Sequence, residues 1–445
     1  MNVDVVVIGA GAAGLAAARH LNEAGIDVTI LEARDRIGGR IFTVREPETS
    51  IPIELGAEFV HGRAPELQSL IDDASLTMLD IGGTRWEPTP TGLRQVNDFW
   101  ERLDRVMRRL SGDARRRDVP FSDFLEKKPG GRTLAADRRL VREYVEGFHA
   151  ADPRLVSAQA LAEGGSPGDD VRERRLGRVI DGYDRVVEWL AKPIVNRIRL
   201  SSVVTSVTWE PHRVEVRVNA ASDVITAKAA IVSVPIGVLK ATAGEEGAIR
   251  FEPPLEAKAD ALGHVASGVV VRVALRFSER FWTSDWFARR HGSDDLDTWS
   301  FLHGHDREFP TWWTAYPLTR PVLVGWCAGP RAVEVGRLPA TAIVEHAQSA
   351  LARMIRVPRR RIASLVEGAW THDWQHDSFA RGAYSYQMVG GAEAPKELAK
   401  PLRGTLVFAG EAIDSEGATG TVHGAIASGR RAARQSLRAL HRSPG

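Results

Sequence analysis

The chain has 445 residues, of which 43% are hydrophobic and 26% charged, and its formal net charge is +2. This length suits two or three globular domains with sizeable cores, and the small net charge gives no electrostatic argument for nucleic acid or a membrane as a partner. A single cysteine, Cys327, excludes an internal disulfide and favours a reducing compartment. With no signal-peptide pattern and no apolar run of 18 residues or more, we expect a soluble, cytoplasmic protein.

The first predicted elements form a dinucleotide-binding unit. Residues 3–8 are an apolar run that predicts a strand, and Gly9, Gly11 and Gly14 then lead into a helix of small residues that reaches about residue 21. In this pattern the three glycines allow a tight turn, a close approach of the backbone to the diphosphate, and close packing of helix on strand. The helix N-terminus adds free N–H groups. A second strand at residues 28–31 delivers Glu32, whose carboxylate can accept the ribose hydroxyls.

Further motifs follow along nearly the whole chain. The segments concerned are residues 32–40, 54–62, 198–204, 232–240, 251–255, 276–282, 382–386, 408–411 and 421–425. In these segments the chain resembles the flavin-dependent amine oxidases, within the branch of polyamine oxidases and histone lysine demethylases. The resemblance is weakest from about residue 85 to 175.

The resemblance implies an α/β fold in which a Rossmann-like FAD-binding domain is interleaved with an α+β substrate-binding domain. We predict that residues 1–80, 177–235 and 400–445 form the FAD-binding domain, and residues 81–176 and 236–399 the substrate-binding domain. Periodicity predicts helices at residues 97–110, 137–148, 340–355 and 424–440, and strands at residues 269–277, 322–327 and 405–408.

The resemblance also implies the cofactor FAD. Because Cys327 lies outside any flavin-attachment motif, we expect FAD to be bound non-covalently, and we expect no metal. Arg40 is the expected phosphate partner, since a guanidinium offers paired donors, whereas the Glu411 carboxylate must bond hydroxyls or N–H groups. The predicted cofactor-binding residues are Gly9, Gly11, Ala13, Gly14, Glu32, Ala33, Arg34, Gly39, Arg40, Gly56, Ala57, Glu58, Phe59, Val204, Gly410, Glu411, Thr421 and Val422.

Four residues are candidates for the substrate side of the flavin. Tyr384 matches one of two aromatic rings that frame the substrate in this family, and the second position is Thr421, which is not aromatic. Thr421 also opens the last predicted helix, so it is either part of the flavin site, an N-cap, or both. Trp374 matches a family tryptophan near the ring, with a core role as the alternative. His61 matches a position near the substrate entrance, with a purely structural histidine as the alternative.

Arg272 is a departure from the family pattern. The strand at residues 269–277 commonly carries a lysine that holds a water at the flavin and assists the reaction with O2, and this chain has arginine there. Arginine is larger, planar and always charged. We consider three interpretations: Arg272 still holds water, it contacts the substrate, or it is a solvent-facing strand residue.

These features predict a catalytic set of Arg272, Tyr384, Thr421, Trp374 and His61, acting on a small-molecule amine. We expect oxidation of a primary or secondary amine, polyamine or monoamine-like, to an imine that is hydrolysed to aldehyde plus amine, with O2 reduced to H2O2. Three alternatives stay open: a flavin dehydrogenase or desaturase of a biosynthetic intermediate that uses another acceptor, an amine oxidase with altered oxygen reactivity because Arg272 replaces the usual lysine, and an interaction protein that keeps flavin only structurally. The oligomeric state is open as well, with a homodimer as one alternative. The tryptophans between residues 282 and 326 are expected in the core or around a substrate cavity.

Overall fold

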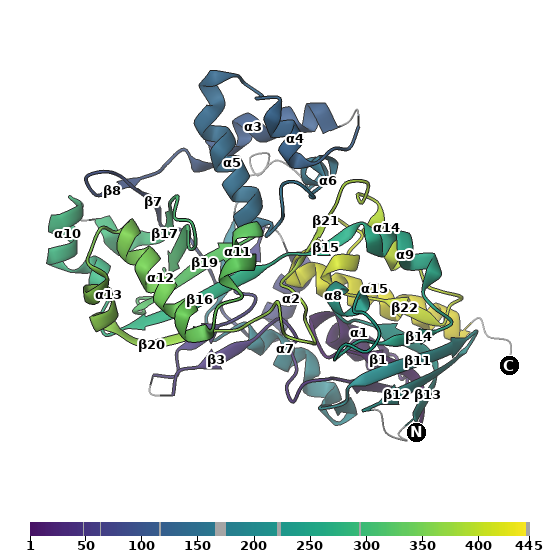
Figure 1. The fold of residues 1–445 in the computed structure, drawn as a ribbon. Helices are drawn as coiled ribbons and strands as arrows, with labels where there is room; N and C mark the ends of the chain where they lie inside the picture. Colours follow the sequence, from purple (N-terminus) through teal and green to yellow (C-terminus); the bar gives the residue numbers. More distant parts are fainter. Residues whose placement is uncertain are drawn as a thin grey trace.

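Two sheets and a group of helices make up the computed structural model (Figure 1). It describes residues 1–47, 49–62, 64–114, 117–164, 175–219, 224–292 and 295–441, without the side chains of residues 111–114 and 295. Parts of the predicted domains, residues 165–174 and 442–445, therefore lie outside the described residues. Among the described helices, none combines the length and the apolar character needed to cross a bilayer.

The first sheet carries the dinucleotide motif and lies at the right of Figure 1. Its strands in spatial order are β10 (Ile198–Arg199), β2 (Val28–Leu31), β1 (Asn2–Ile8), β13 (Val224–Val232), β12 (Arg213–Val218), β11 (Val204–Glu210) and β14 (Arg250–Glu252), with β22 (Leu406–Phe408) also paired to β13. The strands β10, β2, β1, β13 and β22 run parallel. In β1, Val5 and Val7 join one core and Val6 and Ile8 the other, so both faces are buried. This explains the uninterrupted apolar run of the strand.

Helices from both ends of the chain cover one face of this sheet. They are α1 (Ala12–Glu23), α2 (Pro65–Asp73), α7 (Asp184–Ala191) and α15 (Val422–His441). The packing of α15 on α1 is close: a Cβ on Gly429 would come within 2.1 Å of the Ala13 carbonyl oxygen. The N-terminal glycine loop and the C-terminal helix therefore share one site, as the sequence predicts.

The opposite face of the first sheet is covered by α8 (Ile236–Leu239), α9 (Glu256–Gly263) and α14 (Ala394–Ala399). These helices and β14 lie in residues 236–399, which we predict for the substrate-binding domain. The structure differs from the predicted boundaries here, because β14 pairs with β11, and because Ala261, Leu398 and Ala399 pack against this sheet. Both faces of this sheet are apolar, so each must be covered by other elements. Helices α8, α9 and α14, from the segment predicted for the substrate-binding domain, cover the second face.

The second sheet lies at the left of Figure 1 and consists, in order, of β20 (Val366–Thr371), β16 (Val270–Phe277), β19 (Val322–Ala328), β18 (Thr311–Thr314), β17 (Trp299–His303), β7 (Thr84–Pro88) and β8 (Leu93–Gln95). The helices of this lobe are α10 (Asp285–His291), α11 (Pro330–Val335), α12 (Ala340–Met354) and α13 (Arg359–Leu365). The strands predicted at residues 269–277 and 322–327 are found as the neighbouring antiparallel strands β16 and β19.

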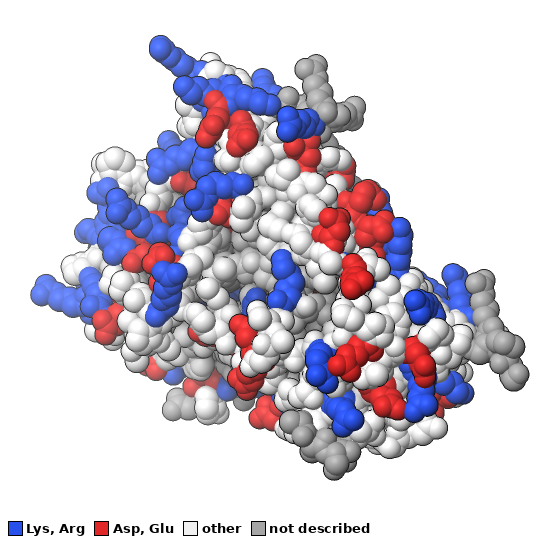
Figure 2. All heavy atoms as spheres, turned by 45° about the vertical axis from the view of Figure 1, so that its right-hand side comes forward, with Lys and Arg blue, Asp and Glu red and all other residues white. Residues whose placement is uncertain are grey.

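A helical lobe stands at the top of Figure 1, with α3 (Phe99–Ala114), α4 (Phe121–Glu126), α5 (Ala135–Phe148) and α6 (Ala158–Glu163). Short sheets join the three parts: β3 (Thr43–Arg45) with β4 (Pro52–Glu54), β9 (Leu176–Val179) between β5 (Phe59–His61) and β6 (Met78–Asp80), and β15 (Val265–Ser267) with β21 (Ser385–Gln387). On the face that Figure 2 draws, acidic and basic side chains both occur, in keeping with the small net charge.

Candidate active site

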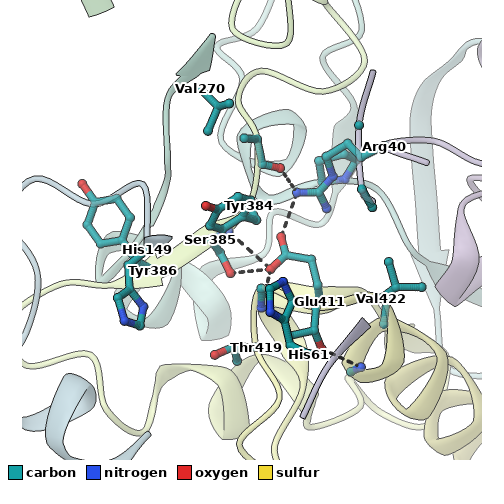
Figure 3. A pocket seen from close by; sticks show the side chains of 18 of the residues that line it. Arg40, His61, His149, Val270, Tyr384, Ser385, Tyr386, Glu411, Thr419 and Val422 are labelled. Atoms are coloured by element: carbon teal, nitrogen blue, oxygen red, sulfur yellow. Dashed lines mark hydrogen bonds and ion pairs between the residues drawn. The ribbon is translucent and has the colours of Figure 1, made fainter. Parts of the chain in front are cut away.

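A single cavity of about 980 Å3 runs from the first sheet to the helical lobe. It is lined by every residue that the sequence predicts for the site except Gly14, which supports the loop from behind. Figure 3 shows its middle, where Arg40 and Val422 lie on one side of Tyr384 and Glu411, and Tyr386 and His149 on the other. The cavity is large for a small amine alone and is of the size that cofactor sites reach.

The glycine loop of α1 forms a cradle at one end of the cavity. Gly9 has φ +104°, a conformation that side chains rarely adopt, and a Cβ on Gly14 would lie 2.0 Å from the Gly9 carbonyl oxygen. At Gly11, in contrast, a Cβ would meet no described atom within 4 Å, and the residue lines the cavity. Gly14 is thus needed for the packing of helix on strand, whereas Gly11 leaves room for a diphosphate. The residues present therefore fit a bound dinucleotide.

Glu32 closes the cradle on the side of the expected ribose. Its carboxylate accepts hydrogen bonds from the backbone N–H groups of Ala10 (2.7 Å) and Arg34 (3.0 Å), so its position is fixed. The Arg34 guanidinium is held in turn by Asp377 at 2.6 Å. Each carboxylate oxygen of Glu32 keeps a further lone pair, which a ribose hydroxyl can use.

Glu411 is the centre of a second cluster of hydrogen bonds (Figure 3). Its Oε1 accepts from Arg40 Nη1 at 2.8 Å, and its Oε2 accepts from Ser385 Oγ at 2.6 Å and from the Gly420 N–H at 3.0 Å. Arg40 also donates to the Ala383 carbonyl. The Glu411 partners are a hydroxyl, an N–H and a guanidinium. The carboxylate therefore holds together the chain segments around Arg40, Ser385 and Gly420 at the cavity wall. The remaining N–H groups of Arg40 suit the phosphate role that we predict for it.

Beyond Glu411 the cavity widens into a chamber of aromatic side chains. The Tyr384 hydroxyl donates to the Phe148 carbonyl at 2.6 Å, which ties β21 to the end of α5. His61 stands edge-on to the Phe148 ring at 5.2 Å, and Tyr144 stacks on the same ring at 4.9 Å. Tyr386 lines the chamber as well.

The histidines of the chamber are neutral at physiological pH. Burial lowers the pKa of His61 to about 4, with His423 and His149 adding to the effect, and burial lowers the pKa of His149 to about 4. A cation entering this chamber therefore meets uncharged rings.

Thr421 and Trp374 each make a structural hydrogen bond and also line the cavity. Thr421 Oγ1 accepts from the Gly424 N–H at 3.0 Å, so it caps α15, and it also lines the cavity. Trp374 is buried, and its indole N–H donates to the Leu55 carbonyl at 2.8 Å while its ring lines the cavity beside Gly56.

Arg272 is buried at 4% exposure, so the interpretation as a solvent-facing strand residue is wrong. Its guanidinium pairs with Glu58 and donates to the Gly56 carbonyl at 3.2 Å. Glu58 is held from its other side by Arg178 at 2.6 Å. Burial alone would raise the pKa of Glu58, but Arg272 and Arg178 outweigh burial and hold that pKa below its usual value.

Comparison with known proteins is consistent with this geometry. The sequence pattern described as "Flavin containing amine oxidoreductase" matches residues 12–437. The chain belongs to this family. Polyamine oxidase 3 of Oryza sativa subsp. japonica is 30% identical to it, over 99% of this chain and 90% of the relative. Lysine-specific histone demethylase 2 of Homo sapiens is 27% identical, over 97% of this chain and 53% of the demethylase.

Solved structures of this amine oxidase fold resemble the chain over its whole length. Putrescine oxidase bound to putrescine gives a TM-score of 0.80 at 21% identity, covering 98% of this chain and 99% of the other. Cyclohexylamine oxidase from Brevibacterium oxydans IH-35A gives 0.80 at 20% identity, covering 99% and 100%. The predicted resemblance and fold class are thus confirmed, and the protein is a flavin-dependent amine oxidoreductase.

The sequence only partly indicated which aromatic residues this amine oxidoreductase would use. Trp312 and Trp313 are neighbours on β18 and point to opposite faces, so Trp312 is buried in the core of the second sheet while Trp313 lines the cavity. Trp326 lines the cavity as well, and Trp282 and Trp299 are core residues. The chamber residues Tyr144, Phe148 and His149 carry no motif, and only the fold brings them together.

Proposed function

We propose that the protein uses non-covalently bound FAD to oxidise a primary or secondary amine to an imine, which water hydrolyses to an aldehyde and an amine, while O2 is reduced to H2O2. The observation that carries this proposal is the cavity itself, which joins a dinucleotide cradle to a chamber lined with aromatic side chains. The oxidase names of the relatives and of the similar structures support the same reaction class. Cys327 is fully buried and is absent from the cavity lining, which supports non-covalent binding.

When bound, the flavin supplies the two-electron acceptor for the C–N bond. The chain contributes the surroundings: the first turn of α15, capped by Thr421, presents N–H groups and the positive end of the helix dipole to the middle of the cavity. Tyr384 is held by Phe148, so its ring is fixed on the chamber side. Because burial costs a charged ammonium group more than a neutral amine, removal of solvent around the bound ligand favours the amine with its lone pair free.

Purified protein tests the cofactor part directly. We expect it to be yellow and to release all of its flavin as FAD on acid precipitation, and flavin left in the pellet would contradict non-covalent binding. Glu32→Ala removes the carboxylate of the cradle and should give largely apoprotein. Asp80→Ala, which removes an exposed carboxylate paired with Arg175, is the matched control and should keep its FAD.

Anaerobic mixing with a panel of primary and secondary amines tests the reaction. A substrate should bleach the flavin, and air should then restore the colour with release of H2O2. Since free alkylamines are largely protonated at pH 7, the rate of bleaching should rise between about pH 7 and 10. A panel without any bleaching would contradict the proposal, and a flat pH profile would remove amine deprotonation from the reductive step.

The Arg272–Glu58 pair favours one alternative, namely slow reaction with O2 and a physiological acceptor other than O2. An arginine held in a buried ion pair cannot give up its proton and has less freedom to hold a water than a lysine. If Arg272 limits reoxidation, Arg272→Lys should speed the reoxidation of reduced enzyme by air while anaerobic reduction changes little. Impaired reduction would instead indicate that Arg272 contacts the substrate. Stopped-flow measurement of the two half-reactions separates these outcomes.

A further inference from the structure

The wall of the cavity contains a buried network of charges, made of Glu58, Arg178, Arg272 and Trp313, which we name the wall network. Glu58 Oε1 accepts from Arg178 Nη2 at 2.6 Å and from its Nε at 3.1 Å. Glu58 Oε2 accepts from Arg272 Nη2 and from the Trp313 indole N–H at 3.0 Å. Two guanidinium groups thus share one carboxylate, and the network keeps a net positive charge.

The two arginines occupy different positions relative to the cavity. Arg178 lies behind the wall and donates to the carbonyls of Ala315 and Tyr316 at 2.7 and 2.8 Å, so backbone atoms hold it in place. Arg272 lines the cavity together with Glu58 and Trp313, and its guanidinium lies 5.4 Å from the Trp313 ring. Arg178 therefore anchors Glu58 from the rear, and Glu58 holds Arg272 at the cavity surface.

Arg272 lies where the two halves of the cavity meet. On one side it donates to the Gly56 carbonyl, next to the Trp374 ring and the Arg40 backbone, and on the other side it faces the aromatic chamber through Trp313. Arg272 would therefore border a flavin held in this cavity between the glycine cradle and Tyr384. Charges at such a buried position act strongly, because little solvent screens them.

We propose that Glu58 is the counter-ion by which this chain sets how easily its bound flavin is reduced. A nearby cation stabilises the negative charge that a flavin gains on reduction, and Glu58 cancels part of the Arg272 charge at the cavity surface. Glu58 is thus a positioning residue that acts through Arg272. The inference rests on the proposed FAD cofactor, and it involves no amine.

Glu54 provides a matched control on the same segment. It is also buried, and it accepts hydrogen bonds from the Tyr183 N–H at 2.8 Å and from Thr43 Oγ1 at 2.7 Å, but it does not line the flavin cavity. Burial raises the pKa of Glu54 to about 7, so this carboxyl carries only part of a charge at neutral pH. Glu54→Gln therefore changes a buried glutamate with little change in the charge on the cavity wall.

The experiment compares FAD-loaded wild type, Glu58→Gln, Glu58→Asp and Glu54→Gln, each reduced gradually with dithionite beside a redox dye and without amine. When the ratio of reduced to oxidised dye is the same in each sample, the ratio of reduced to oxidised flavin should be about tenfold higher in Glu58→Gln than in wild type. For a two-electron couple this corresponds to a reduction potential about 30 mV higher. The ratio should stay near the wild-type value in Glu58→Asp, which keeps the charge, and in Glu54→Gln.

An unchanged or lower ratio in Glu58→Gln, or the same rise in Glu54→Gln, would overturn the proposal. If Glu58→Gln does not fold because two buried cations lose their partner, the double variant Glu58→Gln/Arg178→Met removes one carboxylate together with the cation behind it. Its ratio should still rise, since Arg272 loses the nearer counter-ion, and the absence of a rise would again overturn the proposal. The measurement uses no substrate, so its failure leaves the proposed amine oxidation standing, and a protein without amine turnover can still give the predicted ratios.

Discussion

The glycine cradle and the wall network line the same cavity but are built in different ways. The cradle comes from one short segment, where Gly9, Gly11 and Gly14 shape a loop between β1 and α1. The wall network comes from residues at or near β5, β9, β16 and β18, which are far apart in the chain. Local backbone geometry is sufficient for the cradle. The wall network exists only after the short sheet of β5, β9 and β6 has been placed against the second sheet. The following experiments test this difference, from the largest expected effect to the smallest.

Two alanine substitutions in the cradle should separate folding from cofactor binding. Gly14→Ala places a Cβ 2.0 Å from the Gly9 carbonyl, so the backbone must shift, and we expect flavin to be lost and the apoprotein to be destabilised by about 1–3 kcal/mol. Gly11→Ala meets no described atom within 4 Å, so the apoprotein should keep its melting temperature while its flavin content falls. Flavin content and urea unfolding of the two apoproteins check both statements, and a destabilised Gly11→Ala apoprotein would contradict the difference between the two glycines.

Glu411→Gln tests the cluster between cradle and chamber. The substitution removes the charge that pairs with Arg40 in a largely buried site, and we expect a loss of about 3 kcal/mol in the free energy of unfolding together with weaker FAD retention. Glu393→Gln is the control, because the Glu393–Lys396 pair has the same 2.8 Å distance but is exposed, and it should change stability by less than about 0.5 kcal/mol. Equal effects of the two substitutions would show that burial does not distinguish the pairs.

Tyr384 tests whether the chamber positions the amine by shape or by its hydroxyl. Tyr384→Ala removes the ring, and we expect anaerobic flavin reduction to slow about tenfold or more, since misplaced reactants lose rate steeply. Tyr384→Phe loses only the hydrogen bond to the Phe148 carbonyl and should slow reduction a few-fold at most, with FAD bound in both variants. A rate in Tyr384→Ala that matches wild type would remove this ring from the reacting site.

The buried histidines of the chamber should make the apoprotein sensitive to acid. The pKa values of His61 and His149 are about 4 in the folded protein, below the usual 6.5, so the unfolded chain takes up protons first as the pH falls. Their contribution to stability is complete above pH 6.5 and is lost progressively toward pH 4. His61→Gln should flatten the decline of the unfolding free energy in this window. An unchanged slope in His61→Gln would contradict the assignment of a neutral His61.

The sequence predicted which acidic residues line the cavity better than it predicted which face or sheet the other residues pack against. Glu32 and Glu411 lie in the cavity as expected. Glu32 directly follows the buried strand β2, and Glu411 comes shortly after the buried strand β22, so both side chains lie at the edge of the first sheet. The two interpretations of the tryptophans could not be separated from composition, since Trp312 and Trp313 differ only in the face of β18 on which they lie. The predicted domain boundaries missed α9 and α14, because nothing in an apolar helix face says which sheet it will cover.

The sequence alone determined the dinucleotide cradle, the acidic residue after the second strand, the meeting of the two chain ends and the amine oxidase family. Each of these depends on backbone conformations that specific residues impose locally, or on motifs that recur as contiguous segments. Only the tertiary structure decided that Arg272 is buried, that Glu58 pairs with it, and that Arg178 holds Glu58 from behind. These three side chains are far apart in the chain, and the charge at the cavity wall depends on distances that form only when the sheets pack together.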